Sequence, residues 1–432
     1  MRNYNPNPVI KRIAVKAECF FTSPAILGSG YGENTDSDIL RDSKGTPFLS
    51  GSTVAGALNH LCPQAAAIFG GKDDISPLWV YDCNLPKESV IELDGVALDP
   101  KHENKTASDE AKFDYEAIST DTKFTIRLLL TVRKGDRDKG YEGMLANIVG
   151  ALKSNSIAFG AKTRRGFGRT GCISTVKREF DLSHGNHDIL NDWIGFDWES
   201  TSGWAVAESC EFSGKTATIT AKLRLEDGSI MIRSTSNIFD ESSTEAPDYG
   251  HISVGNKPVI LGTSWAGAIR SGLYKLLIQK FPDSTEVYLN EAFGSVSEDE
   301  RNATASQIIF GMSTLEAKDA ACDGYRSITR VKIDRFTGGA AQGALLTEKP
   351  WYGGETTLEI RYPDNREDIK ELILLGLEGI DSGLMQIGGE TSIGRGFFKV
   401  VAINGEEPKS FLKKPKNNLL KAITGEVQQY DN

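Results

Sequence analysis

The sequence predicts an α+β protein made of two tandem copies of one domain. Two matches within the chain carry this prediction. Residues 47–58 read PFLSGSTVAGAL, and residues 258–269 read PVILGTSWAGAI, 211 positions later without a gap. Residues 159–168 read FGAKTRRGFG, and residues 387–396 read IGGETSIGRG, 228 positions later. Two matches in the same order indicate a duplicated domain, and such a chain offers similar surfaces side by side to a long, repetitive ligand.

The length of the chain fits two domains. A chain of 432 residues is too long for one compact core, and two domains of about 200 residues lie in the usual size range. The polar segment DWESTSGWAV around residue 200 predicts the boundary. We therefore expect a first domain at 1–200 and a second at 201–405. Residues 406–432 are expected to form a surface tail with one short helix.

Each copy is expected to open with a strand and a helix. Residues 13–20 and 216–225 alternate apolar and polar side chains, which is typical of half-buried strands. After a polar loop, Ser52 or Thr53 in the first copy and Thr263 or Ser264 in the second are suitable helix N-caps. Apolar positions at helical spacing follow in both copies: Val54, Leu58 and Leu61, matched by Trp265, Ile269 and Leu273.

The later elements also occur in pairs. Both copies continue with a Phe-Gly turn, two strands, an irregular polar stretch, another strand, a helix, the Gly-rich loop and a closing strand. The expected strands are 78–82, 95–99 and 123–130 in the first copy, and 307–311, 330–334 and 357–362 in the second; the helices are 141–154 and 365–379. This order, with its insertions, is that of a ferredoxin-like or RRM-like sheet.

The bulk composition excludes some classes of protein. The formal net charge is −10, which argues against a protein that coats nucleic acid indiscriminately, although Lys162, Arg164, Arg165 and Arg169 form a local basic cluster. Six scattered cysteines without a CxxC pair argue against a zinc knuckle or a disulfide framework and favour a cytoplasmic location. No apolar run approaches the length of a membrane span, so we expect no membrane partner.

The two helix starts are candidate phosphate sites. Gly51, Ser52 and Thr53 begin one helix, and Gly262, Thr263 and Ser264 begin the other. Exposed N–H groups and the positive end of the helix dipole attract anions there, and the hydroxyls add donors. The alternative is that these residues only cap a helix, which Ser and Thr commonly do.

The Gly-rich loops differ in charge between the copies. Lys162, Arg164 and Arg165 favour contact with an RNA backbone. The second copy has Glu390, Ser392 and Ile393 at these positions, which leaves Arg395 as its main cation. A dinucleotide-binding fingerprint is excluded, because neither loop opens a helix that is followed by an acidic residue. A plain tight turn remains the alternative.

These motifs resemble a known family. The segment RDSKGTPFLSGSTVAGAL (41–58) and the two GxxTxxGxG loops are similar to the RAMP superfamily of CRISPR-associated proteins, and most similar to backbone subunits of type III effector complexes. Two such copies in one chain resemble the fused backbone subunits of type III-D-like systems. The resemblance implies two tandem RAMP domains that bind guide RNA and complementary target RNA beside other effector subunits. It adds Arg41 to the RNA-binding candidates and implies thumb hairpins within 100–122 and 335–354.

The resemblance also implies metal-dependent cleavage of the target RNA. An Asp in the loop before the first helix of each domain would hold Mg²⁺ or Mn²⁺. The matching residue is Asp36 in the first copy, with Asp38 and Asp42 as competitors. In the second copy it is Asp248, with Asp240 or no active residue as alternatives. Two other functions stay open: a non-catalytic backbone that only holds the RNA duplex, and a guide-processing endonuclease, which the lack of a His in either Gly-rich loop disfavours.

Overall fold

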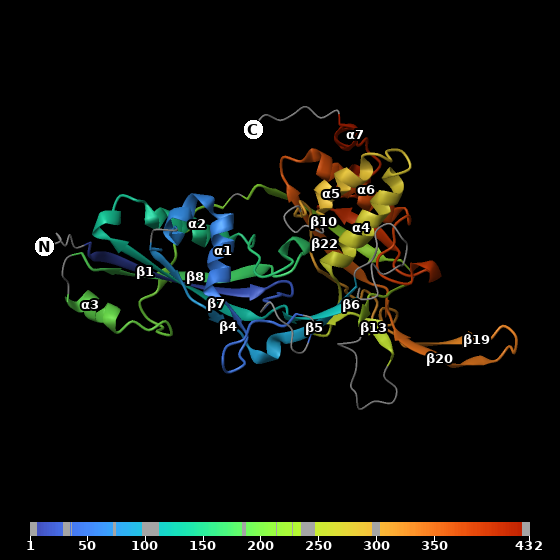
Figure 1. The fold of residues 1–432 in the computed structure, drawn as a ribbon, viewed down its shortest axis with the longest axis horizontal. Coiled ribbons are helices and arrows are strands. Elements are labelled where there is room, and N and C mark those ends of the chain that lie inside the picture. Colours follow the sequence, from blue (N-terminus) through green and yellow to red (C-terminus); the bar gives the residue numbers. More distant parts are fainter. Residues whose placement is uncertain are drawn as a thin grey trace. The chain divides into compact units, whose positions relative to one another are not determined.

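A computed structural model describes most of the chain in two compact units. The described residues are 7–28, 35, 37–71, 75–96, 112–183, 187–212, 214–226, 228–234, 247–295 and 303–425. Unit 1 contains residues 1–91, 116–163 and 168–214, and unit 2 contains residues 92–115, 164–167 and 215–432. Both combine helices with antiparallel sheets (Figure 1). Unit 2 therefore includes two short segments of the first repeat.

Unit 1 is built on a five-stranded sheet in the order β3-β7-β1-β8-β9. The central strand β1 pairs antiparallel with β7 and with β8. Strands two, three, one and four of the repeat thus lie in the ferredoxin-like order, as predicted. The elements are β1 (Val9–Phe21), β2 (Phe48–Leu49), α1 (Gly51–Leu61), η1 (Pro63–Phe69), β3 (Leu78–Val80), β4 (Cys83–Asn84), η2 (Lys87–Ser89), β7 (Lys123–Arg133), η3 (Lys134–Asp136), α2 (Tyr141–Lys153), β8 (Thr170–Asp181), α3 (His187–Ile194) and β9 (Ala205–Val206).

Two further strands and one short helix of the first repeat contain residues of both units. Strands β5 (Val90–Val96) and β6 (Lys112–Ile118) form a two-stranded sheet, and the 3-10 helix η4 spans Thr163–Arg165. The predicted first thumb, 100–122, lies partly outside the described residues. Its described part contains β6, which leads into β7.

Unit 2 repeats the same arrangement. Its main sheet has the order β16-β22-β10-β23, which again is strand two, three, one and four of the repeat. The alternation in residues 216–225 predicted β10 to the residue. The strands are β10 (Thr216–Leu225), β11 (Ser229–Ile230), β12 (Arg233–Ser234), β13 (Tyr249–His251), β14 (Ser253–Val254), β15 (Lys257–Ile260), β16 (Ile309–Phe310), β17 (Ser313–Thr314), β18 (Gly324–Tyr325), β19 (Ile328–Ile333), β20 (Ala340–Lys349), β21 (Trp351–Tyr352), β22 (Glu355–Pro363) and β23 (Phe398–Ile403).

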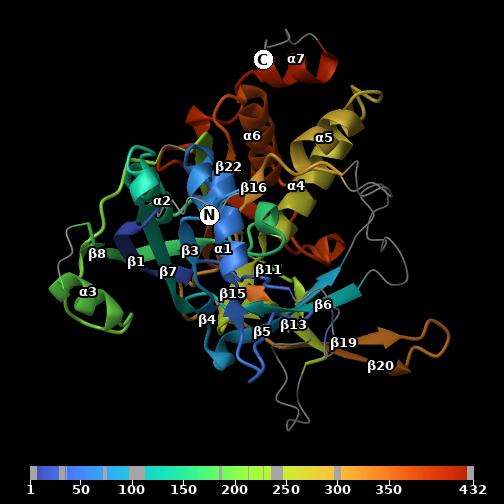
Figure 2. The ribbon, with the colours of Figure 1, turned by 60° about the vertical axis from the view of Figure 1, so that its left-hand side comes forward.

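The helices of unit 2 pack on one face of this sheet, where the core lies (Figure 2). They are α4 (Gly262–Leu277), α5 (Thr285–Phe293), α6 (Glu367–Asp381) and α7 (Asn417–Thr424), with the 3-10 helices η6 (Thr391–Ile393) and η7 (Pro408–Ser410). The predicted apolar positions Trp265, Ile269 and Leu273 are all buried. The Trp265 Nε1–H donates to Ser313 Oγ at 2.9 Å, which satisfies its polar atom inside the core.

Two segments, one at the end of each repeat, pack more closely against their unit than their sequences predict; the short helix expected in the tail is present as α7. Residues 201–214 belong to unit 1, because β9 pairs with β8 and the rings of Trp198 and Trp204 stack with centroids 6.1 Å apart. The expected surface tail contains α7, which packs against α6 and buries Leu419 and Ile423. No pattern in the sequence predicted α5 as a separate helix. Among the described residues, no helix is both long and apolar enough to cross a membrane.

The polar segment around residue 200 covers one face of the sheet in unit 1. The helices α1 and α2 lie on the face that carries the core, and α3 lies against the opposite face (Figure 1). There the Arg12 guanidinium lies 4.3 Å from the ring centroid of Trp193, and Lys16 Nζ donates to the Trp198 carbonyl oxygen. The sheet face that an RRM uses for RNA is therefore closed by residues of this chain.

Candidate nucleic-acid interface

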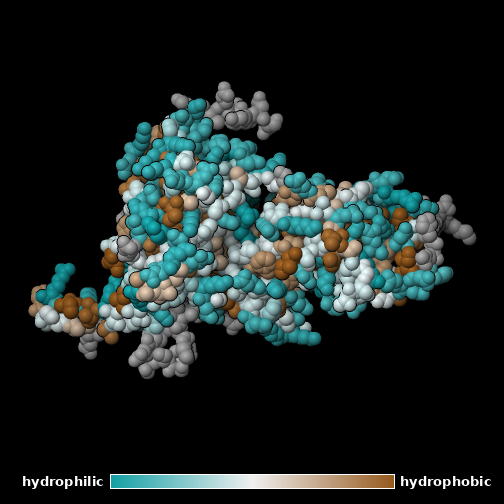
Figure 3. Space-filling model, turned by 180° about the vertical axis from the view of Figure 1, so that it is seen from behind, coloured by the Kyte–Doolittle hydropathy of each residue, from teal (hydrophilic) through white to brown (hydrophobic). Residues whose placement is uncertain are grey.

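The β19–β20 hairpin of unit 2 is the most exposed apolar feature of the described residues. Its strands pair antiparallel, and the turn between them contains Phe336, which is fully exposed. Leu345 is 66% exposed, and Val331 and Ile333 on the other strand are also exposed. Figure 3 shows hydrophobic side chains along this extension. The predicted thumb at 335–354 thus covers the turn and the second strand, and the hairpin begins earlier, at Ile328.

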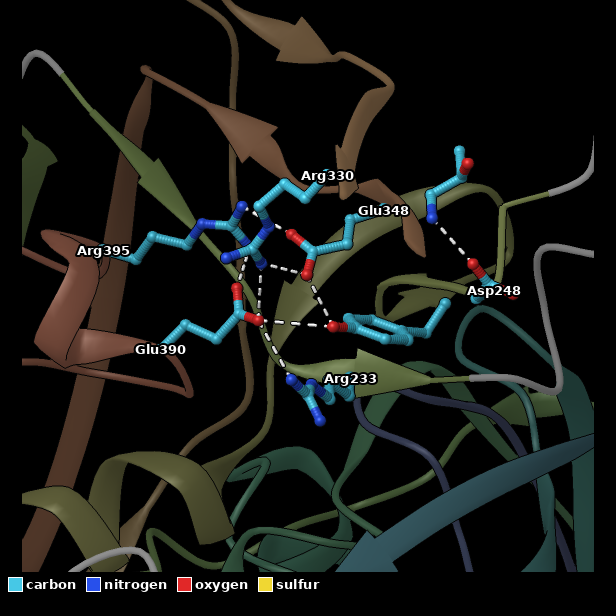
Figure 4. A network of polar contacts seen from close by, with 8 residues as sticks. Arg233, Asp248, Arg330, Glu348, Glu390 and Arg395 are labelled. Carbon is cyan, nitrogen blue, oxygen red and sulfur yellow. Dashed lines mark hydrogen bonds and ion pairs between the residues drawn. The ribbon is translucent and has the colours of Figure 1, made fainter. Parts of the chain in front are cut away.

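A buried ionic network fixes the base of this hairpin (Figure 4). Glu348 of β20 has no exposed surface and accepts hydrogen bonds from Arg395 Nη2 at 2.8 Å, from Tyr249 Oη at 2.5 Å and from Arg330 Nη2. Glu390 accepts from Arg330 Nη2 at 2.8 Å, from Arg233 Nη2 at 2.9 Å and from Arg395 Nη1. Three arginines therefore face two carboxylates.

The network joins three segments that are far apart in sequence. Arg330 and Glu348 come from the hairpin, Glu390 and Arg395 come from the second Gly-rich loop, and Tyr249 comes from the loop that carries Asp248. Burial opposes the ionised form of Glu348, but the hydrogen bonds from Tyr249, Arg330 and Arg395 lower its pKa to about 2. Glu348 is therefore a carboxylate at neutral pH, and the hairpin and the Gly-rich loop are held together by charge.

Asp248 lies beside the second strand of the hairpin. Its backbone N–H donates to the Thr347 carbonyl oxygen at 2.8 Å, and its Oδ2 accepts from the Thr347 backbone N–H at 2.7 Å. Its side chain is exposed, and Oδ1 has no partner among the described residues. One oxygen of the carboxylate thus accepts a backbone hydrogen bond, and the other is available to a ligand.

The first Gly-rich loop exposes two of the predicted cations. Gly166 and Gly168 have φ values of 88° and 68°, and a Cβ at Gly166 would lie 2.2 Å from the Phe310 carbonyl oxygen. Only glycine fits this contact, which packs the loop backbone against β16 within unit 2. The side chains of Arg164 and Arg165 are exposed and have no hydrogen-bond or ion-pair partner among the described residues.

The helix starts are capped differently from the prediction. Ser50, rather than Ser52 or Thr53, is the N-cap of α1, and its Oγ accepts from the Thr53 backbone N–H at 3.2 Å. The Gly51 N–H donates to Asp82 Oδ1 at 2.6 Å. This N–H group is therefore already hydrogen-bonded within the chain and is not available to a phosphate. These contacts support the helix-cap interpretation for α1.

The N-cap of α4 also differs from the prediction. Leu261 precedes the helix in extended conformation, so neither Thr263 nor Ser264 is its N-cap. Gly262 is buried, whereas Thr263 and Ser264 are half-buried. A Cβ at Gly262 would lie 2.7 Å from the Arg165 carbonyl oxygen, so the first Gly-rich loop covers the beginning of this helix.

The fold and the duplicated loops agree with a comparison of the chain with family models. The model of the RAMP superfamily matches residues 20–170 and again residues 250–399, together more than half of the chain. The chain belongs to the RAMP superfamily. RAMP proteins bind RNA and assemble with other subunits in CRISPR complexes, so these coarse expectations and the tandem ferredoxin-like fold are confirmed. A search of curated proteins found no match.

Within this RAMP chain, the acidic loop of the first repeat is only partly described. Asp36 lies outside the described residues. Asp38 is buried and its Oδ1 accepts from the Thr35 backbone N–H at 3.0 Å. The Asp42 carboxylate accepts from the backbone N–H groups of Thr46 and Lys44, which lower its pKa and close a turn. Both competitors of Asp36 therefore have local structural contacts.

Two of the arginines predicted to bind RNA form ion pairs with glutamates of this chain. Arg41 donates to both oxygens of Glu116, at 2.6 and 2.7 Å. Arg395 is 5% exposed and is enclosed by Glu348 and Glu390. Arg395 is the main cation of the second loop, as expected, but this burial argues against the predicted contact between its guanidinium and RNA. Lys162 is half-buried.

The sequence did not indicate the two buried glutamates. Glu116 near the end of β6 and Glu348 near the end of β20 are equivalent, because each precedes the third strand of its repeat and pairs with arginine. Neither lies in a motif shared by the two copies. Only their burial, which the structure shows, indicates the pairing, because a buried Glu requires a cationic partner.

Proposed function

We propose that this RAMP protein is a guide-RNA-binding backbone subunit of a type III, III-D-like CRISPR effector that holds the guide with its target. The fully exposed Phe336 on a hairpin with a rigid base carries this proposal. Exposed apolar side chains of this kind indicate a binding surface. Stacking of a nucleobase on an aromatic ring contributes about 1–3 kcal/mol per base, so Phe336 and Leu345 are suited to contact unstacked bases.

RNA phosphates are proposed to contact the exposed arginines of the first Gly-rich loop. Arg164 and Arg165 have no partner among the described residues, and each neutralised phosphate releases counterions. The closed sheet face of unit 1 supports an interface made from loops and hairpins instead of the sheet. The first Gly-rich loop covers the start of α4, and the Asp82 carboxylate holds the first N–H of α1, so neither helix start is proposed as a phosphate site.

We further propose that the complex cleaves target RNA in a metal-dependent manner, with Asp36 and Asp248 as the candidate ligands. An exposed carboxylate with one open oxygen, as in Asp248, fits the way Mg²⁺ is bound when waters and a substrate phosphate complete its shell. Mn²⁺ accepts similar oxygen ligands. When bound, the metal would offset negative charge on the phosphate. No group of three metal-ligating side chains occurs in the described part of the chain.

The chemistry proposed is attack of a ribose 2′-oxygen on the adjacent phosphorus. The bond to the 5′-oxygen breaks, which gives a 2′,3′-cyclic phosphate and a 5′-hydroxyl. The 2′-hydroxyl proton leaves to solvent or to a nearby carboxylate, and the leaving oxygen takes up a proton. The attack must be in line with the leaving oxygen, so an apolar wedge that unstacks the target next to Asp248 contributes by orientation.

A second candidate function is a scaffold that holds the duplex without cutting it. The hydrogen bond from the Thr347 N–H to Asp248 favours this alternative, because it gives the carboxylate a structural role. Both candidates share the same RNA-binding surfaces. They differ only in the effect of replacing Asp36 and Asp248.

Photo-cross-linking tests the proposed interface. The complete complex is assembled with guide or target RNA that carries 4-thiouridine, irradiated, and digested for peptide mapping. We expect cross-linked peptides that contain the hairpin turn at 334–339 and the loop at 163–166. Cross-links confined to other surfaces of this chain, in a complex that still binds target RNA, would contradict the proposal.

A further inference from the structure

Two of the six cysteines lie opposite each other on neighbouring strands of unit 1. Cys19 of β1 pairs with Cys172 of β8 in the antiparallel register, although the two residues are far apart in the sequence. Residues opposite each other in such a pair point to the same face of the sheet. Both side chains accordingly lie on the core face, where Cys19 is 2% exposed and Cys172 is half-buried. The fold therefore brings together two thiols that no sequence motif connects.

The backbone geometry of this pair suits a disulfide bridge. The Cys172 N–H donates to Asn155 Oδ1 at 3.1 Å, so it makes no ladder hydrogen bond to Cys19. Opposite residues without ladder hydrogen bonds are the closer kind, with Cα atoms about 4.5 Å apart. A disulfide bridge requires Cα atoms about 4.4–6.8 Å apart. A β-bulge at Ile173 directly follows, so the ladder is already interrupted at this point. The two sulfur atoms can therefore join without a separation of the strands.

The two thiols interact directly and differ in acidity. A hydrogen bond between them raises the pKa of Cys19 and lowers the pKa of Cys172, which the charge of Lys153 lowers further. Burial and the charge of Glu18 act on the pKa of Cys172 in the opposite direction. Thiolates react with peroxides much more readily than thiols do, and a half-buried side chain is accessible to a molecule as small as hydrogen peroxide. Cys172 is thus the residue that reacts first, with Cys19 beside it in the core.

We propose that Cys19 and Cys172 form a reversible disulfide bridge when the protein meets hydrogen peroxide. The Cys172 thiolate attacks one peroxide oxygen and the O–O bond breaks. The other oxygen leaves as hydroxide and becomes water with the proton that Cys172 released, which leaves a sulfenic acid on Cys172. The Cys19 sulfur then attacks the Cys172 sulfur, and the sulfenic hydroxyl leaves as water with the Cys19 proton. The two thiols lose two electrons in all, and one peroxide is reduced to two waters.

The bridge fastens the strand ends from which the first Gly-rich loop emerges. After this pair, β1 and β8 pair only through two further residues each, and the Arg169 N–H then donates to Ser23 Oγ at 3.0 Å. A bridge here also closes a loop of about 150 residues in the unfolded chain, so the oxidised form should be the more stable one. Exchange with an external thiol reverses the reaction. This modification site goes beyond the proposed function and does not depend on it.

Peptide mapping of the full chain without RNA tests this site. Cys210→Ser with Cys322→Ser first removes the two exposed thiols. This parent protein is treated with hydrogen peroxide, alkylated and analysed by mass spectrometry. We expect a loss of about 2 Da, because two hydrogen atoms leave, and a linked pair of peptides that contains Cys19 and Cys172. Reduction should restore the mass, and the oxidised form should melt at least about 4 °C above the reduced form.

Two further variants of the parent protein assign the roles of the thiols. Cys19→Ala should leave a sulfenic acid on Cys172 that reacts with dimedone, whereas Cys62→Ala, at a buried thiol outside the pair, should still form the bridge. A parent protein that keeps its thiols at peroxide concentrations that oxidise free cysteine would overturn the inference. A bridge from Cys172 to Cys83, or an oxidised Cys172 that does not join Cys19, would also overturn it. None of these measurements involves RNA, so their failure is distinct from a failure of the proposed function.

Discussion

Glu348 and Arg395 form an ion pair at 2.8 Å in the interior of unit 2, with side chains that are 0% and 6% exposed. One belongs to the hairpin and the other to the Gly-rich loop. The pair explains how an exposed hairpin holds a fixed direction: its base is tied by charge to a loop that is itself fixed by glycine geometry. Removing one partner leaves the other as an uncompensated buried charge.

Replacement of Glu348 is therefore predicted to destabilise unit 2 strongly. Glu348→Gln leaves Arg330 and Arg395 without their carboxylate, and breaking a buried pair in this way costs about 3–5 kcal/mol. Urea unfolding of the variant measures this free energy. Glu359→Gln, at an exposed residue whose nearest cation is 3.9 Å away, should change it by less than about 0.5 kcal/mol. Equal stability of both variants would refute the structural role of the network.

The stability of unit 2 is predicted to fall as the pH drops below neutrality. Burial lowers the pKa of His251 to about 3; its Nδ1 accepts from the Ile232 N–H, and its Nε2 has no partner in the part of the chain that the structure describes. The unfolded chain, with an ordinary His pKa near 6.5, binds a proton that the folded chain excludes. The free energy of unfolding should therefore decrease below about pH 6.5, by up to about 1.4 kcal/mol per pH unit.

Thermal unfolding of wild type and His251→Gln between pH 7 and pH 5 checks this prediction. The glutamine amide oxygen is able to accept the Ile232 N–H but does not titrate. The variant should show a flatter dependence on pH, although its absolute stability at neutral pH is lower. Parallel pH profiles for the two proteins would show that His251 is not the titrating group.

Sequence patterns predicted the features that depend on neighbouring residues and missed those that depend on contacts between residues far apart in the chain. The alternation in 216–225 predicted β10 correctly, and the apolar spacing in α4 identified Trp265 and Ile269 as core residues, because these patterns are local. The burial of Arg395 depends on Glu348, 47 residues away, and no local pattern contains that pairing. The cover on the sheet of unit 1 was missed for a similar reason: Trp193 contacts Arg12 of β1 and Phe180 of β8, and both are contacts between residues far apart in sequence.

The hairpin turn is predicted to act in RNA binding without contributing to stability. Phe336→Ser together with Leu345→Ser removes two exposed apolar side chains, so the melting temperature should stay unchanged within error. Target-RNA binding by the assembled complex should weaken by about tenfold or more, since each lost stacking contact is worth about 1–3 kcal/mol. Ile173→Ser, at an exposed position of β8, is the matched control. Unchanged target binding by the double variant would count against the hairpin as a thumb.

The arginines of the first Gly-rich loop are predicted to bind phosphates. Arg164→Ala with Arg165→Ala should reduce RNA affinity and also the dependence of affinity on salt. The slope of log K against log salt should fall by about 0.7 for each lost contact to single-stranded RNA. Lys409→Ala with Lys414→Ala removes the same charge from an exposed region outside the loop and serves as the control. Loss of affinity with an unchanged slope would point to a structural defect.

Cleavage of a labelled complementary RNA by the assembled complex with Mg²⁺ tests the central claim most directly. Wild type is compared with Asp36→Ala, Asp248→Ala and the double variant, with guide loading verified for each. If both repeats cut, each single variant should lose a different product and the double variant should lose both, while target binding is retained. Unchanged products from all three variants would contradict the account and leave this chain as a scaffold.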